Sequence, residues 1–439
     1  MRWLHLVKLA ITALLVTTSS CARQTTATNS NVPQPLFSSN DPRAVYAADP
    51  NDSWNRIFRL LFTRTYKVRM SSDFPEGAPF VAFKDAMALP SLNISSATFE
   101  RTEIGDRAID PLYPSFFTGA GYKQILTDSA FAEFKQALTD ALNETKTRPP
   151  LARALMQSDL WAAFDSIFFF YPREATAGYL PEREQQLLRL LRQLIKKLAL
   201  TSEEIASLRS NYADAVTAKN LPDVFSSRAG WIEIELLSRR LHDDSAGFRR
   251  AARVFIKPRT TPSDPAAFVE SLKYHEHLED VEAVGLVVQN LLLNNQEQIA
   301  PSPIISEAQF RFFKDNKGAQ PVDAFVKQYE LSRRLLLTEP GSGGFIELNE
   351  KSAAYLTQSG NDYTFISSIR KADAPVLVPL RTRCMQCHFK SLTTMMTYSI
   401  HYVPPVPTVK ILNASANDRA LYVATQKALR EDYRSLLSP

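Results

Sequence analysis

Helical periodicity dominates the middle of this 439-residue chain, from about residue 121 to 250. Apolar residues there recur every three or four positions, which gives an α-helix one buried face. The sequence therefore predicts a helical bundle or array in this part of the chain. The segments with the clearest pattern are 130–142, 151–169 and 182–200.

Helix-start signals support this reading. Pro181 precedes the third segment, and proline is favoured in the first turn of a helix. Thr201 and Glu204 form a capping-box pattern, in which each side chain satisfies a backbone N–H at the start of a helix. We expect that helix to run to about Ala218.

The segment before the helical region is expected to be mostly irregular. Residues 54–66 are apolar enough to form a first helix, but residues 67–120 contain several prolines that oppose long regular elements. These prolines are Pro75, Pro79, Pro90, Pro111 and Pro114.

The composition changes after residue 250. Residues 253–257, 281–293 and 365–369 are rich in β-branched and aromatic side chains, which favour strands. The prolines in 375–380 oppose a helix and favour an extended segment. Gly341-Ser342-Gly343-Gly344 predicts a flexible loop and a domain boundary near residue 340.

The run Cys384-Met385-Gln386-Cys387-His388 is a C-x-x-C-H motif. Two thiols at this spacing can form thioethers with the vinyl groups of a porphyrin, and the adjacent imidazole can bind the iron. The motif predicts one covalent haem c, held by Cys384 and Cys387, with His388 as the proximal iron ligand. The alternatives are a thiol redox pair and half of a zinc site. A thiol redox pair of the thioredoxin type would be expected in a βαβ unit, and no such unit surrounds the motif. A zinc site usually needs a second C-x-x-C pair, and the sequence contains none.

The distal iron ligand is less constrained than the proximal one. His401 is a candidate because the thirteen residues after His388 allow the chain to cross the porphyrin, and an ordinary histidine is the alternative. Met395 is a weaker candidate, since a helix of seven residues advances only about 10 Å along the proximal side. His275 and His277 flank Glu276 and are remote candidates, although they also fit a solvated polar face.

Two arginines precede the motif. Arg381 and Arg383 could pair with the haem propionates through bidentate hydrogen bonds, or could simply be surface charges.

The N-terminus has the pattern of an export signal. Arg2 and Lys8 precede an apolar run that is too short for a permanent membrane span, and residues 1–20 are predicted to be a signal peptide. Cys21 then stands where a bacterial lipoprotein carries its lipid; ordinary cleavage near Ser20 is the alternative. Residues 21–50 are rich in small polar residues and are expected to form a flexible tether.

At Cys384, Cys387 and His388 the chain resembles c-type cytochromes, and the resemblance covers that pentapeptide and the export signal. It implies covalent haem attachment outside the cytoplasmic membrane. All three cysteines thereby have an expected role, and none remains for a disulfide.

The expected fold class is mainly α with some β (α+β). A mainly helical body is predicted at 51–340 and a smaller mixed haem-bearing region at 341–439. A chain of this length exceeds what one hydrophobic core usually serves.

Three functions fit these features. The first is an exported cytochrome, periplasmic or membrane-anchored, whose single haem carries electrons between partners. Its partner is a redox protein or a small-molecule donor or acceptor. The second is a peroxidase-like haem enzyme with an open distal site. The third is a partner-binding lipoprotein in which haem is a sensor or a structural element. A net charge of +5 without a basic block does not suggest a nucleic-acid partner, and membrane attachment is expected through lipid.

Overall fold

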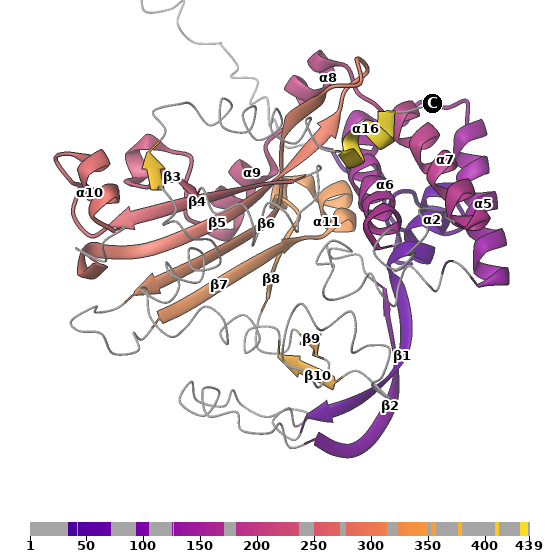
Figure 1. The fold of residues 1–439 in the computed structure, drawn as a ribbon, viewed down its shortest axis with the longest axis horizontal. Coiled ribbons are helices and arrows are strands. Elements are labelled where there is room, and N and C mark those ends of the chain that lie inside the picture. The colour runs from indigo at the N-terminus through magenta and orange to yellow at the C-terminus, as the bar shows by residue number, and fades with distance from the viewer. Residues whose placement is uncertain are drawn as a thin grey trace, which may run out of the picture. The chain divides into compact units, whose positions relative to one another are not determined.

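The structure of the chain is a computed structural model. It contains a group of packed helices, a seven-stranded antiparallel sheet and a smaller four-stranded sheet (Figure 1). The mixed α+β class predicted from the sequence is confirmed. The residues that the structure describes are 34–41, 43–71, 94–104, 125, 127–170, 181–236, 250–272, 278–313, 324–348, 353–356, 376–379, 409–411 and 431–437.

The helices of the first half pack on one another. α5 packs against α2 and α7, and α6 packs against the same two helices. α6 is apolar on most sides, and Trp161 and Phe164 within it are fully buried. α7 instead buries a stripe that includes Leu187, Leu191 and Leu194 and leaves charged residues on its other side. Each such side chain contributes about 1.5–3 kcal/mol through burial. The α-helices are α2 (Ser53–Phe62), α5 (Asp128–Asn143), α6 (Pro150–Phe170), α7 (Glu182–Lys197), α8 (Ser202–Ser207), α9 (Asn211–Lys219), α10 (Pro265–Leu272), α11 (Arg333–Thr338) and α16 (Glu431–Leu437).

The larger sheet has the strand order β11-β3-β4-β5-β6-β7-β8, and all its neighbouring strands are antiparallel. Its centre is the hairpin of β5 and β6, whose residues are almost all buried. The last residues of β5 belong to the same apolar cluster as the helices, which explains why β5 lacks a polar face there. The strands are β3 (Ile232–Leu236), β4 (Arg250–Pro258), β5 (Val281–Leu293), β6 (Ile299–Phe313), β7 (Ala324–Leu331), β8 (Phe345–Leu348) and β11 (Val409–Ile411).

The smaller sheet has the order β2-β1-β10-β9. β1 pairs antiparallel with β2 and parallel with β10, and β10 pairs antiparallel with β9. A segment that precedes the large sheet in sequence therefore meets a segment that lies between its strands β8 and β11. The strands are β1 (Thr63–Ser71), β2 (Ile94–Ile104), β9 (Ala353–Leu356) and β10 (Val376–Pro379).

Two buried side-chain amides join helices to the central hairpin. Gln157 of α6 donates to the carbonyl of Leu293 at 2.9 Å and accepts from its N–H at 2.8 Å. Asn211 of α9 does the same for Ile305, with distances of 2.9 and 2.8 Å. Each amide satisfies backbone groups of a strand as a neighbouring strand would. Ile305 lies beside a shift in the β5–β6 register, and Leu293 lies beyond the last residue of β5 that pairs with β4.

Most of the predicted helices are confirmed, with changed ends. The first helix ends at Phe62 rather than at residue 66, because the β-branched and aromatic residues that follow continue as β1. The capping box of Thr201 and Glu204 is present in α8, with N–H···O distances of 2.9 and 3.1 Å. That helix stops at Ser207, and Ser210 caps α9 as a separate helix.

Residues 67–120 were predicted to be irregular, and this was wrong for two stretches. β1 extends to Ser71, and β2 occupies 94–104 between Pro90 and Pro111, so the prolines flank the strand rather than interrupt it. The extended conformation predicted for 375–380 is confirmed as β10, and the β-rich textures at 253–257 and 281–293 are confirmed as β4 and β5.

The glycine-rich run near residue 340 is a packed turn rather than a flexible loop. Gly343 and Gly344 have φ of +71° and +70°, and a Cβ on Gly343 would lie 2.4 Å from the carbonyl oxygen of Asn211. The 3-10 turn Pro340–Ser342 precedes these two glycines. Two other 3-10 turns are Ser227–Ala229 and Leu278–Asp280. β7 and β8 lie on either side of the predicted boundary and pair in one sheet, and strands fill much of 232–331, within the range expected to be mainly helical.

Among the described helices, none combines the length and apolar character that crossing a membrane would require.

Candidate functional site

The predicted haem site lies outside the described residues. This applies to Cys384, Cys387 and His388, to the distal candidates His401 and Met395, and to the lipidation candidate Cys21. His275, His277, Arg381 and Arg383 lie outside them as well. All six histidines and all three cysteines of the chain fall in these segments. Accordingly, the described residues contain no group of three or more His, Cys, Asp or Glu side chains that could hold a metal ion.

The strands that flank the motif are described. β10 ends at Pro379, five positions before Cys384, and β11 begins at Val409, twenty-one positions after His388. Five residues span at most about 18 Å, so the motif begins within that distance of the end of β10. β10 pairs with β1 and β9, whereas β11 pairs with β3 at one edge of the large sheet. The segment that carries the motif is thus fixed at its two ends in two different sheets.

A buried ion pair holds the N-terminal segment to the helices. Asp159 of α6 accepts three hydrogen bonds from the Arg333 guanidinium at 2.5–2.9 Å and one from the Tyr46 hydroxyl at 2.5 Å. The side chains are 1% exposed for Asp159 and 6% for Arg333. Burial raises the pKa of Tyr46 well above its usual value, and the Asp159 carboxylate adds to this. Burial alone would lower the pKa of Arg333, but Asp159 outweighs it and the pKa is raised.

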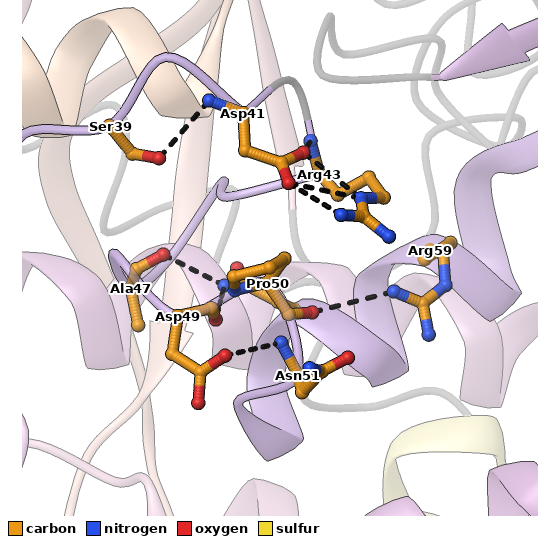
Figure 2. A network of polar contacts seen from close by, with 9 residues as sticks. Ser39, Asp41, Arg43, Ala47, Asp49, Pro50, Asn51 and Arg59 are labelled. Atoms are coloured by element: carbon orange, nitrogen blue, oxygen red, sulfur yellow. Dashed lines mark hydrogen bonds and ion pairs between the residues drawn. The ribbon is translucent and has the colours of Figure 1, made fainter.

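Neighbouring contacts organise the chain that leads into α2. Asn55, fully buried, accepts from the N–H groups of Val45 and Tyr46 at 2.9 and 2.7 Å. Figure 2 shows the Arg43 guanidinium against the Asp41 carboxylate, joined by three hydrogen bonds of 2.6–3.2 Å. Hydrogen bonds from Arg43 lower the pKa of Asp41 to about 2. These contacts fix the end of the predicted tether on the folded body. Arg43 and Asp41 form an ion pair with each other.

A second cluster of buried polar residues lies on one face of the large sheet. We define the β6–β7 polar face as Glu307, Gln309 and Arg311 on β6 with Gln328 and Glu330 on β7. Cross-strand pairing of Glu307 with Glu330, and of Gln309 with Gln328, places these side chains on the same side. Glu307 accepts from the amides of Gln309 and Gln328, the latter at 3.4 Å. Glu307 is 5% exposed, Gln309, Arg311 and Gln328 are each 8% exposed, and Glu330 is half-buried.

The opposite face of the sheet is mainly apolar, and among its described residues Arg253 and Glu233 form a buried ion pair. Arg253 of β4 donates to both carboxylate oxygens of Glu233 at 2.8 Å and lies 4.5 Å from the centre of the Phe225 ring. Arg253 is itself 5% exposed, so the pair anchors the 221–225 segment over the sheet. Its groups satisfy one another, which is typical of a structural ion pair.

The sequence did not predict these polar clusters. Arg333, Asp159 and Tyr46 are far apart in the chain and match no motif. The alternation Glu307, Gln309, Arg311 in an otherwise apolar strand is a signal that could have identified the polar face.

No family model, curated protein or solved structure matches the chain.

Proposed function

We propose that the chain is an exported c-type cytochrome with one covalent haem, anchored as a lipoprotein through Cys21, that carries electrons in the periplasm or at a membrane surface. The observation that carries the proposal is the pentapeptide Cys384–His388. Its electron partner is a redox protein or a small-molecule donor or acceptor. The N-terminal signal supports this proposal because haem is attached to such motifs outside the cytoplasm.

Each residue of the motif has a distinct part in this proposal. The Cys384 and Cys387 thiols bond the porphyrin vinyl groups, and His388 binds the iron from one side. The haem supplies one-electron chemistry when bound. Covalent attachment keeps it in place during repeated turnover, and the imidazole sets part of its reduction potential.

The rest of the chain is consistent with this role. Residues 380–408 lie between two strands that are paired in sheets, so the motif is carried on a segment of limited reach. The described end of the tether is held by Tyr46, Asp159 and Arg333. Cys21, the proposed lipid attachment site, lies 25 positions before Tyr46 in the sequence.

Haem staining after denaturing gel electrophoresis tests the proposal. The full chain is expressed with the cytochrome c maturation machinery, beside Cys384→Ala, Cys387→Ala and Cys21→Ala variants. We expect staining of the wild type and of Cys21→Ala, and strongly reduced staining of the other two. A wild-type band without stain, in cells that load a control cytochrome, overturns the proposal.

Ligand binding then separates the electron carrier from a haem enzyme. A carrier with two protein ligands has an optical spectrum that carbon monoxide changes little in the reduced state. Rapid and complete carbon monoxide binding to the wild type would instead support the peroxidase-like alternative. Spectra of His401→Ala and Met395→Ala then identify the distal ligand, since loss of the ligand opens the iron.

A further inference from the structure

Two arginines of α7 have no carboxylate partner among the residues that the structure describes. Arg189 and Arg192 are three positions apart, so their side chains leave the helix on the same side. Burial, and then the charge of Arg189, lower the pKa of Arg192, and no carboxylate counters these two effects. Like charges this close on a helix destabilise it, and a bound anion would remove that repulsion.

The other described cations of α7 have acceptors. The Arg183 guanidinium lies 2.6 Å from the Asp128 carboxylate, and the Lys196 ammonium lies 3.0 Å from the Glu297 carboxylate. Lys197 donates to three backbone carbonyl oxygens at and just beyond the end of α5, at 2.6–3.3 Å. Unpaired positive charge on this helix is therefore concentrated at the two arginines.

Arg192 is held in position by the two helices beside it. Its guanidinium carbon lies 5.7 Å from the centre of the Phe164 ring on α6, and its Nη2 donates to the Ser435 hydroxyl of α16 at 3.1 Å. Its Nε is buried without a hydrogen-bond partner. None of its described hydrogen bonds uses Nη1, so the donors of this nitrogen remain for a ligand. A guanidinium that packing has already fixed loses little conformational entropy when it binds an anion.

α16 forms the second wall of this site. It lies beside α6 and α7 (Figure 1), and its Leu436 is fully buried in the apolar cluster to which those helices contribute. The Lys196 ammonium donates to the carbonyl oxygen of Leu437 at 3.1 Å, which holds the last turn of α16 against α7. The Ser435 hydroxyl is thereby kept beside Arg192.

A terminal phosphate group is the anion that matches two neighbouring guanidinium groups. Guanidinium donors bind the oxygens of carboxylates and phosphates in pairs. A carboxylate has two oxygens and one charge, which a single arginine satisfies. A phosphate monoester has three acceptor oxygens and about two negative charges, so it can accept from Arg189 and Arg192 together.

From these observations we propose that Arg189 and Arg192 bind a terminal phosphate group where α7 meets α16, with Phe164 and Ser435 positioning the second guanidinium. Inorganic phosphate, a soluble phosphate monoester and phosphatidic acid in a membrane all present this group. The site does not depend on the proposed haem.

Thermal unfolding with inorganic phosphate tests the site in solution. The full-length chain with Cys21→Ala is compared with the same chain carrying Arg189→Gln, and sodium chloride of equal ionic strength replaces phosphate in the reference samples. Arg189 is exposed and makes no hydrogen bond or ion pair with a described residue, so its substitution leaves the fold intact. Arg183→Gln is the matched control, because it removes a cation of the same helix that is already paired.

We expect phosphate at about ten times its Kd to raise the unfolding midpoint of the parent chain and of Arg183→Gln by about 1–3 °C. Arg189→Gln removes a charged hydrogen bond to the ligand and should weaken binding by about 10–100-fold. The rise at the same phosphate concentration should then fall to less than half.

Co-sedimentation with phosphatidylcholine vesicles, with and without phosphatidic acid, distinguishes the sources of the phosphate group. Cys21→Ala ensures that the proposed lipid does not itself attach the chain to the vesicles. Binding that requires both phosphatidic acid and Arg189, without a response to inorganic phosphate, assigns the site to a lipid headgroup, and the reverse result assigns it to a soluble phosphate. If neither probe binds, or if Arg189→Gln responds like the parent chain and Arg183→Gln, the proposal is overturned.

Discussion

Replacing Asp159 with Asn should destabilise the folded chain by about 3–5 kcal/mol, the usual effect of leaving one buried charge without its partner. The carboxylate is 1% exposed and receives three of its hydrogen bonds from Arg333. Arginine does not relieve the loss by shedding its proton, because its ordinary pKa lies far above neutral pH. Asn keeps the size of the side chain, so the effect reports charge rather than a cavity.

Two further variants separate this explanation from a general packing effect. Tyr46→Phe removes one hydrogen bond to the carboxylate and leaves the ion pair intact, so it should cost about 1.5–3 kcal/mol. Asp159→Asn/Arg333→Gln removes both charges, and should be more stable than Asp159→Asn alone because no buried charge remains unpaired.

Urea unfolding followed by tryptophan fluorescence and by circular dichroism gives the free energies of unfolding for all four proteins. Trp54 lies next to Tyr46 and reports on this region, with ring centres 5.9 Å apart. A loss below 1 kcal/mol for Asp159→Asn, or a double variant that is no more stable than Asp159→Asn, would refute the reasoning.

Other parts of the structure give shorter predictions. Gln157→Leu leaves two buried backbone groups of β5 without partners and should cost about 2–4 kcal/mol in the same unfolding assay. Gly343→Ala should unfold several degrees below wild type in a thermal melt, because a Cβ would lie 2.4 Å from a backbone oxygen and φ is +71°. The pKa of Asp41 is lowered to about 2. The ionised carboxylate therefore stabilises the fold above the ordinary carboxyl pKa, and this stabilisation is lost as the pH falls through about 2. Asp41→Asn should lose less stability between pH 4 and pH 2 than wild type.

The helices were predictable because their signals are local. The capping box at Thr201 and the apolar spacing of 151–169 depend on residues a few positions apart. β2 was missed because its evidence is its pairing with β1, about thirty positions away, which a single sequence does not display.

The polar clusters were missed for the same reason on a larger scale. Asp159 and Arg333 are separated by 174 positions, and only the fold brings them together. The glycine-rich run was predicted to be a flexible loop because glycine permits many backbone conformations. In the structure Gly343 instead adopts a positive φ in a tight turn packed against Asn211. The C-x-x-C-H motif can be recognised in the sequence because the covalent haem attachment that it predicts requires neighbouring residues.

The intact mass of the purified protein decides whether the chain carries covalent haem. We expect a mass that exceeds the processed polypeptide by one haem, with lipidation at Cys21 as a separate increment, and loss of the haem increment in the Cys384→Ala/Cys387→Ala variant. A wild-type mass equal to that of the polypeptide and its lipid alone, from cells with active cytochrome c maturation, would contradict it.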